Sequence, residues 1–164
     1  MTIGATMAVP AFSPHEAEIR DAVVRLCAPF DDAYWLAKDR DGGFPEDFHR
    51  AFAEAGWLGI CIPQEHGGSG LGVTEAAVMM QAVAESGAGL SGASALHMNI
   101  FGLNPVVKFG TDRLKDTFLP RAAAGDPAPE FPDEDIARLK HEISRPDQFT
   151  INFDYLVRRL ERRG

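Results

Sequence analysis

Features that mark several classes of protein are scarce in this sequence of 164 residues. It has two cysteines, Cys27 and Cys61, and no CxxC pair, so it lacks the framework of a small disulfide-stapled secreted domain. No apolar run approaches the roughly 18 residues that a membrane span needs. The first residues show no basic segment followed by an apolar stretch, which argues against a signal peptide. We therefore expect a cytoplasmic protein with reduced thiols and no membrane partner.

Positive charge is also in short supply. The 16 Lys and Arg residues stand against 24 Asp and Glu residues, which gives a net charge of −8 at pH 7. A nucleic-acid-binding domain needs a basic stripe, so we expect no nucleic-acid partner. The arginines of 158–163 are interpreted as a solvated helix end. The whole sequence has 45% hydrophobic and 24% charged residues, a composition typical of one globular domain.

Helix signals dominate the first three quarters of the chain. Caps at Ser13, Thr74 and Thr111, helically spaced apolar residues, and stops at Gly56 and Gly125 mark the helix ends. They predict helices over residues 14–27, 31–39, 44–55, 74–86, 91–109 and 112–124. We therefore expect an all-α fold, an antiparallel helical bundle of about six helices with a short helical C-terminal tail.

Two connections and the tail differ from this pattern. Residues 57–63 are predicted to be a buried extended piece or an irregular connection, and 64–73 a glycine-rich loop. Prolines after Gly125 predict a linker, followed by short helices over Glu134–Ser144 and Asn152–Arg163. The expected organisation is a flexible arm over 1–13, a helical domain over 14–126, and a linker with short helices over 127–164.

Four stretches, in fixed order over about residues 14–126, resemble the acyl-CoA dehydrogenase family. Residues 44–60 are a helix that leads into a Gly-Trp corner, and residues 62–71 are a loop with a proline, an acidic residue and paired glycines. Residues 83–88 are a helix end that contains a Glu, and residues 109–126 contain the Phe-Gly-Thr and Leu-Pro landmarks. Gln64 stands where the family usually has an acid. The resemblance implies the amino-terminal helical domain of this flavoenzyme family.

The resemblance carries expectations about activity. The family oxidises acyl-CoA thioesters to 2-enoyl-CoA, with a carboxylate base and FAD as hydride acceptor. The base comes from a carboxy-terminal bundle, and many flavin contacts come from a middle β-domain that opens with a strand and a Thr-Glu-Pro motif. Neither follows Asp126 in this sequence. The resemblance therefore implies a truncated member that keeps part of the acyl pocket, holds no catalytic residue and lacks independent activity, with FAD bound in the full-length family.

The same resemblance places the acyl-facing positions of the helix over 91–102 at Ala93, Ser94 and His97, with Phe101 nearby. Small side chains there would leave a groove for an acyl-CoA tail. Two alternatives stay open. The small residues would also let helices approach closely, and a lone histidine in an apolar helix is more often a hydrogen-bonded core residue than a catalyst.

Other chemistry-bearing residues are weighed against ordinary structural roles. Glu65 beside His66 invites an acid–base role, but loop residues that cap backbone groups are the preferred interpretation. The glycines of 67–72 lack the GxGxxG spacing of a nucleotide loop. No two histidines make an HxxxH pair, so no metal site is expected. Three of the five methionines, Met79, Met80 and Met98, are predicted core fillers.

Two other functions stay open besides the dehydrogenase family. The chain could be a helical protein-interaction module whose exposed apolar face binds partners or forms a homo-oligomer. It could also be a non-functional fragment.

Overall fold

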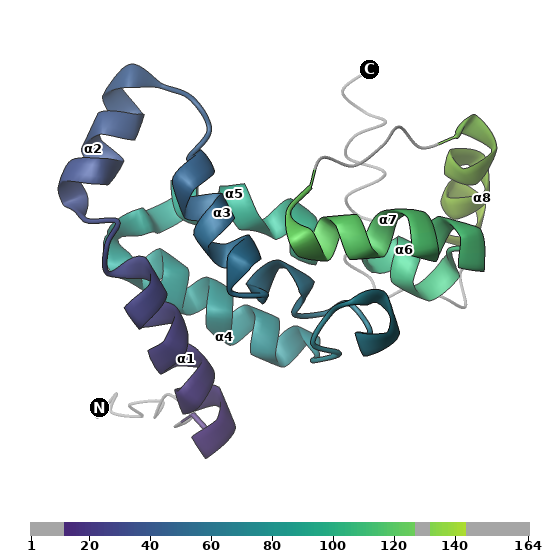
Figure 1. Cartoon of the computed structure of the whole chain (residues 1–164), viewed down its shortest axis with the longest axis horizontal. Helices are drawn as coiled ribbons and strands as arrows, with labels where there is room; N and C mark the ends of the chain where they lie inside the picture. The colour runs from purple at the N-terminus through teal and green to yellow at the C-terminus, as the bar shows by residue number, and fades with distance from the viewer. Residues whose placement is uncertain (1–11, 127–131, 144–164) are drawn as a thin grey trace, which may run out of the picture.

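The structure is a computed structural model that describes residues 12–126 and 132–143. All regular structure in these residues is helical, which confirms the all-α prediction (Figure 1). The α-helices are α1 (Pro14–Cys27), α2 (Asp32–Asp41), α3 (Glu46–Glu54), α4 (Val73–Val83), α5 (Gly89–Ile100), α6 (Asn104–Phe109), α7 (Asp112–Ala124) and α8 (Asp133–Ile143). Three short turns connect some of them: η1 (Trp57–Gly59), η2 (Gln64–His66) and the π-helical η3 (Ala84–Ala88).

Most helix ends form where the capping residues predict them. At the start of α1, the Ser13 hydroxyl accepts from the Glu16 N–H at 3.3 Å, and the Glu16 carboxylate accepts from the Ser13 N–H at 2.6 Å. This reciprocal pair satisfies two otherwise unpaired donors. Thr111 caps α7 through the Leu114 N–H at 3.2 Å. Gly125 ends α7 in the left-handed conformation, with φ at +76°.

Two predicted helix boundaries were wrong. The helix expected over 91–109 is two helices, because α5 ends at Ile100 and α6 begins at Asn104. Pro105 lies in the first turn of α6, where its missing N–H has no intrahelical partner to lose. Thr74 does not cap α4; Gly72 does, and its N–H donates to the Glu75 carboxylate at 2.9 Å.

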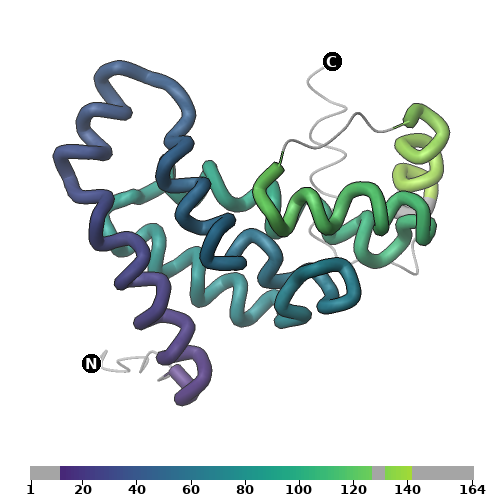
Figure 2. The backbone as a smooth tube through the Cα atoms, in the orientation of Figure 1, coloured from purple at the N-terminus to yellow at the C-terminus, as the bar shows by residue number. Residues whose placement is uncertain are grey.

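The turn η3 reverses the chain between α4 and α5, so these two helices run in opposite directions (Figure 2). Gly87 permits the reversal with φ at +94°, a conformation that side chains with a Cβ rarely adopt. Arg20 of α1 bonds the Glu85 carboxylate of η3 at 2.7 Å, on the surface. The reversal places α5 under α2 and α3, where Gly92 is close to both Trp35 and Phe48.

The core has two apolar clusters. The larger one contains side chains from each helix from α1 through α5 and from η1. Trp35 and Phe48 are in edge-on contact there, and its largest fully buried members are Phe48, Phe52, Leu58, Ile60 and Met79. The smaller one lies under α6 and α7 and contains Ile62, Val106, Leu114, Phe118, Leu119, Ala122 and Ala123. Burial of Met79, and of Met80 in part, confirms those two as core fillers. Met98 is 61% exposed, so its core assignment was wrong.

Residues 57–72 form an irregular connection, as one of the two sequence interpretations expected. The chain turns at η1 and η2, and backbone bonds then tie the second half of the segment to the first. Ser69 N–H donates to Gly59 at 2.9 Å, Gly70 N–H to Ile62 at 2.8 Å, and Leu71 N–H to Ile60 at 2.9 Å. This compact loop joins the two apolar clusters, since Ile60 belongs to the first and Ile62 to the second.

The predicted tail lies partly outside the described residues. The helix expected over Glu134–Ser144 is confirmed as α8 and begins one residue earlier, at Asp133. The helix expected over Asn152–Arg163 and nearly all of the 1–13 arm lie outside the described ranges. Among the helices that are described, none combines the length and apolar character needed to cross a membrane.

Candidate functional site: an exposed face of α5

The outer face of α5 carries the residues that the sequence predicts for acyl binding. Ser94 and Phe101 are exposed, whereas Ala93 and His97 are half-buried. Their spacing of one, three and four residues puts them on one side of the helix. Three large apolar side chains share the surface around them: Leu90, 84% exposed, Met98, 61%, and Phe101 itself, 40%. The helix therefore presents an apolar strip, which we call the α5 face.

Two grooves flank this face, with Phe44 in the wall of both. The smaller, of about 400 Å³, runs beside the first half of α5 and is lined by Gly43, Phe44, Pro45, Leu90, Ser91, Ser94 and Ala95. The larger, of about 750 Å³, lies among α3, the end of α5 and the end of α7. Apolar surface makes up part of both, so each can accept a hydrocarbon chain.

The four predicted residues have different surroundings. Ser94 lines the smaller groove. Ala93 packs against the larger core cluster, so its small side chain also serves helix packing. Gly92 next to it is buried, and a Cβ there would meet the Ala88 methyl group at 2.5 Å. The same Cβ would lie 3.3 Å from Trp35 of α2 and 3.4 Å from Phe48 of α3, so close packing explains Gly92, while Ser94 is left open to the groove.

His97 has a defined hydrogen bond. Its Nδ1 lies 2.9 Å from the Ser94 carbonyl oxygen, one turn earlier in α5. Because a carbonyl only accepts, Nδ1 donates this hydrogen bond, and in the corresponding tautomer Nε2 has the lone pair. The histidine is tied to its own helix and stands at the edge of the α5 face. It can accept a hydrogen bond at Nε2.

The larger groove contains polar residues that the sequence did not single out. His49 of α3 places Nε2 3.5 Å from the Asn99 Oδ1, and Asn99 donates to the Ala122 carbonyl at 3.4 Å. Arg50 and Glu46 line the same groove. These residues come from three helices that are distant in sequence, so no local motif marked them.

Glu65 and His66 do not form an acid–base pair. His66 is directed toward α7, where its Nδ1 lies 3.4 Å from the Asp116 carboxylate. Its side chain is only 14% exposed, whereas that of Asp116 is 72% exposed. The contact joins η2 to α7, so His66 has a structural role, although through a side chain of α7 and not through the backbone groups that the sequence interpretation expected.

The glycine loop is not a phosphate cradle. A cradle needs backbone N–H groups that are free to point at an anion. Here each N–H from residue 67 to residue 72 donates within the chain, the first five to backbone carbonyls and that of Gly72 to Glu75. The loop therefore does not fit the pyrophosphate of a flavin dinucleotide, and no step through a flavin is assigned to these residues.

The remaining titratable groups make no second site in the part of the chain that the structure describes. No group of three His, Cys, Asp or Glu side chains there is arranged to hold a metal. Both cysteines are free thiols. Burial raises the pKa of Cys27, which a hydrogen bond with Ser86 partly offsets. Burial, followed by the Glu75 charge, raises the pKa of Cys61. Neither thiol has the lowered pKa of a nucleophile.

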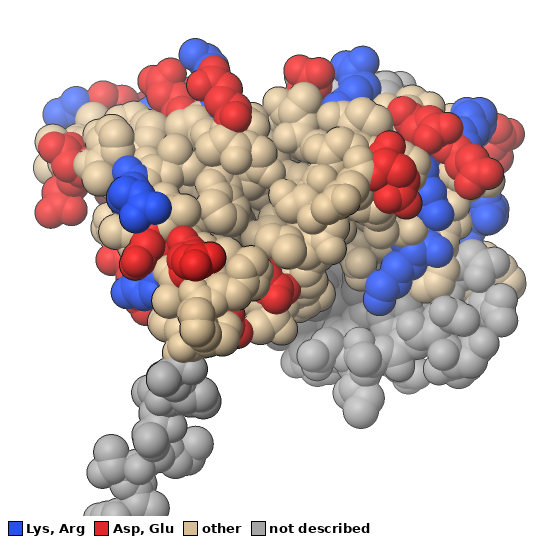
Figure 3. Space-filling view, turned by 60° about the horizontal axis from the view of Figure 1, so that its bottom comes forward, with Lys and Arg blue, Asp and Glu red and all other residues tan. Residues whose placement is uncertain are grey.

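Figure 3 shows one face of the protein, with acidic and basic side chains at its rim and also on its left and right parts. Neutral side chains fill its middle, and the acidic and basic groups stand around them.

Comparison with known proteins identifies the family. The acyl-CoA dehydrogenase N-terminal domain matches residues 13–126. Acryloyl-CoA reductase (NADH) of Anaerotignum propionicum is 39% identical over 88 residues, which are 53% of this chain and 22% of that protein. Acyl-CoA dehydrogenase FadE12 of Mycobacterium tuberculosis is 29% identical over 138 residues, 80% of this chain and 34% of that protein.

A mitochondrial relative matches a similar region. Isovaleryl-CoA dehydrogenase of Pongo abelii is 25% identical over 121 residues, 73% of this chain and 28% of that protein. The chain thus spans between 22% and 34% of the length of these three relatives. The family's N-terminal domain matches most of this chain, and the described residues have an all-helical fold. The chain therefore belongs to the acyl-CoA dehydrogenase family.

Proposed function

We propose that the α5 face is one wall of an acyl-CoA-binding site in a flavin-dependent acyl-CoA dehydrogenase. The observation that carries the proposal is the exposed apolar strip of Leu90, Met98 and Phe101 with Ser94 open to the groove beside it. A thioester tail is a narrow hydrocarbon chain, and burying it against this strip removes apolar surface from water on both sides.

The residues have distinct roles in this proposal. Ala93 and Ser94 leave space beside the helix, and Phe101 contacts the tail. His97 limits the site at its edge and offers the Nε2 lone pair to a bound donor. None of these is a proton-abstracting carboxylate. In the family FAD accepts the hydride. We therefore propose that the 164-residue chain by itself binds the acyl group without oxidising it.

A second candidate function rests on the same strip. Exposed apolar surface of this kind also attracts other protein surfaces. A homo-oligomer through the α5 face would place Leu90 and Met98 of two copies together. The two functions exclude one another, because an oligomer would cover the α5 face that acyl-CoA needs.

We also propose a cytoplasmic location. Its support is chemical: both cysteines are free, and compartments that form disulfides favour their oxidation.

Binding of octanoyl-CoA to the full chain, measured by calorimetry with CoA alone as the reference, tests the proposal. Ser94→Trp fills the smaller groove and is expected to weaken binding about tenfold, the loss of about 1.4 kcal/mol. Leu36→Trp, at an apolar position 69% exposed on α2, is the matched control and leaves binding unchanged. Equal affinity for CoA and octanoyl-CoA would refute an acyl site on α5.

Two further measurements separate the alternatives. Flavin absorbance near roughly 450 nm in the purified chain, together with substrate-dependent bleaching, would contradict the proposal that this chain lacks activity on its own. A concentration-dependent dimer that Leu90→Asp and Met98→Asp dissociate, with no octanoyl-CoA binding, would favour the interaction module.

A further inference from the structure

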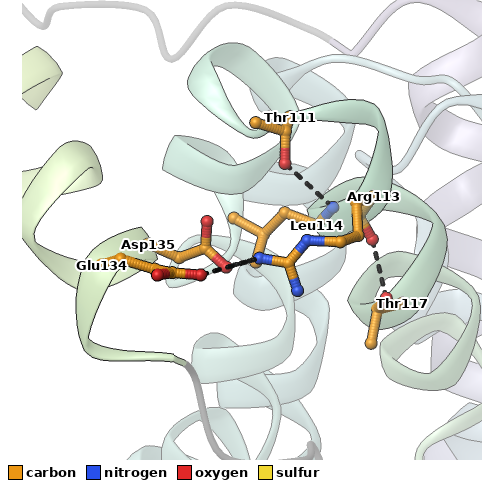
Figure 4. Close-up of polar contacts among 6 residues, drawn as sticks. All are labelled: Thr111, Arg113, Leu114, Thr117, Glu134 and Asp135. Atoms are coloured by element: carbon orange, nitrogen blue, oxygen red, sulfur yellow. Dashed lines mark hydrogen bonds and ion pairs between the residues drawn. The ribbon is translucent and has the colours of Figure 1, made fainter.

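The helix α8 is held against the domain by a charge pair with one buried partner. Asp135 Oδ2 accepts from Arg113 Nη2 at 2.6 Å, and Glu134 Oε1 lies 3.7 Å from the same nitrogen (Figure 4). The Asp135 side chain is 7% exposed, whereas that of Arg113 is 61% exposed. Among the described residues, Asp135 is the buried charged side chain. Removing the guanidinium would leave this carboxylate buried without its partner, which is costly.

Both partners of the pair stand in the first turn of a helix. Arg113 stands in the first turn of α7, which Thr111 caps through Leu114, so its position is fixed by the backbone. Asp135 stands in the first turn of α8, together with Asp133 and Glu134. Negative charge at a helix start interacts favourably with the helix dipole. The acidic turn of α8 therefore suits both its own helix and the arginine opposite.

Apolar contact supplies the rest of the attachment. Leu139 packs against the smaller core cluster, two side chains of which are Val106 of α6 and Leu114 of α7. The Pro132 carbonyl accepts from the N–H groups of Asp135 and Ile136, at 2.9 and 3.0 Å, and so starts the helix. A helix of 11 residues is marginal alone in water. The order of α8 thus depends on the surface formed by α6 and α7, which we call the α6–α7 face.

The helix α8 lies outside the residues that match the family's N-terminal domain. The match to the family's N-terminal domain ends at residue 126, and α8 begins at Asp133, so the α6–α7 face lies within the matched range and α8 follows it. Figure 1 shows α8 beside α6 and α7, at the opposite end of the molecule from α2. We propose that the α6–α7 face is a docking surface for an amphipathic helix with an acidic first turn, and that α8 of the same chain occupies it as a displaceable cover.

Hydrogen exchange of the full chain tests whether the arginine holds the cover. Arg113→Ala is expected to speed exchange of the amides over 133–143 at least tenfold, an effect of about 1.4 kcal/mol. Arg113→Lys keeps the charge without the planar fork and is expected to restore part of the protection. Glu85→Gln is the matched control, because it breaks another 2.7 Å pair with arginine on an exposed surface. It leaves exchange over 133–143 unchanged.

Docking in trans tests whether the face is a binding surface. In the full chain with Asp135→Lys, the cover is repelled by Arg113 and the face is open. A fluorescent peptide of residues 132–143 with the native Asp135 is expected to bind this variant at least tenfold more tightly than the wild-type chain, whose own α8 competes. The same peptide with Asp135→Asn is the control and binds more weakly.

Three results would overturn the proposal. Unchanged exchange over 133–143 in Arg113→Ala would show that the pair does not hold α8. Equal binding of the peptide to both chains, or to neither, would show that the face is not a docking surface. Exchange between two chains that yields a dimer of the wild type would replace the cover with a domain swap.

Discussion

Gly68→Ala should unfold the glycine loop locally, and the structure gives the size of the effect. A Cβ at residue 68 would overlap the carbonyl group and the Cβ of Ile62. The obstacle is backbone and a buried side chain, so it cannot move aside as a flexible side chain would. The loop must shift as a whole instead. The glycine is required here by space and not by a left-handed backbone.

The shift disrupts three backbone hydrogen bonds of the loop. They are donated by the N–H groups of Gly68, Ser69 and Gly70 at 3.1, 2.9 and 2.8 Å. With each bond contributing about 1 kcal/mol net, Gly68→Ala should lower the free energy of unfolding by about 3 kcal/mol. That is a large part of the roughly 5–15 kcal/mol by which a typical domain is stable.

The neighbouring glycine provides the control. Gly67 has φ at +83°, but a Cβ there meets no atom within 4 Å. Gly67→Ala therefore costs only the left-handed conformation, about 1 kcal/mol. Urea unfolding followed by circular dichroism measures both variants. If Gly68→Ala destabilised the chain no more than Gly67→Ala does, the steric argument would be refuted.

Two other predictions concern ionisable groups. Cys27 is buried and Cys61 is only half-buried, so at pH 8 a disulfide reagent should modify Cys61 first and Cys27 only as fast as the domain opens. Cys61→Ser should remove the fast phase of the reaction. Equal modification rates for the two thiols would contradict the burial pattern. The backbone and hydroxyl of Ser13 hold the pKa of Glu16 below its ordinary value. Its contribution to α1 is therefore fully present above the ordinary glutamate pKa and is lost as pH falls through the lowered value. Amide exchange at the start of α1, followed between pH 3 and pH 6, should show this loss, and Glu16→Gln should remove it. Ser13→Ala keeps the backbone N–H that donates to the Glu16 carboxylate, so it should only reduce the loss.

Local sequence determined most helix ends because capping is a local interaction. Ser13, Thr111 and Gly125 act on neighbouring residues, so their roles follow from type and spacing alone. The α5–α6 break was missed although Pro105 was visible in the sequence. A proline is compatible with the first turn of a new helix as well as with a kink in a continuous one, and packing of α6 on α7 selects the former.

Part of the candidate site could likewise be predicted from the sequence, and part became visible only in the structure. The resemblance to the family singled out Ala93, Ser94, His97 and Phe101, and the structure leaves Ser94 and Phe101 exposed. Periodicity did not show that Met98 also faces outward, since a methionine in an apolar helix is ordinarily core. Nor did it show the larger groove, because His49, Asn99 and the end of α7 meet only after folding.

The sequence by itself therefore determined the helical class and most helix ends, which depend on residue type and short-range spacing, and its resemblance to known proteins determined the family. Tertiary structure alone decided three things. It satisfied every N–H of the glycine loop within the chain, which removes a phosphate site. It directed His66 to Asp116 and away from acid–base chemistry with Glu65. It buried Asp135 against Arg113, 22 residues earlier in the chain. Each outcome depends on which distant groups meet, and the physical reason is that burial and pairing are properties of the packed chain.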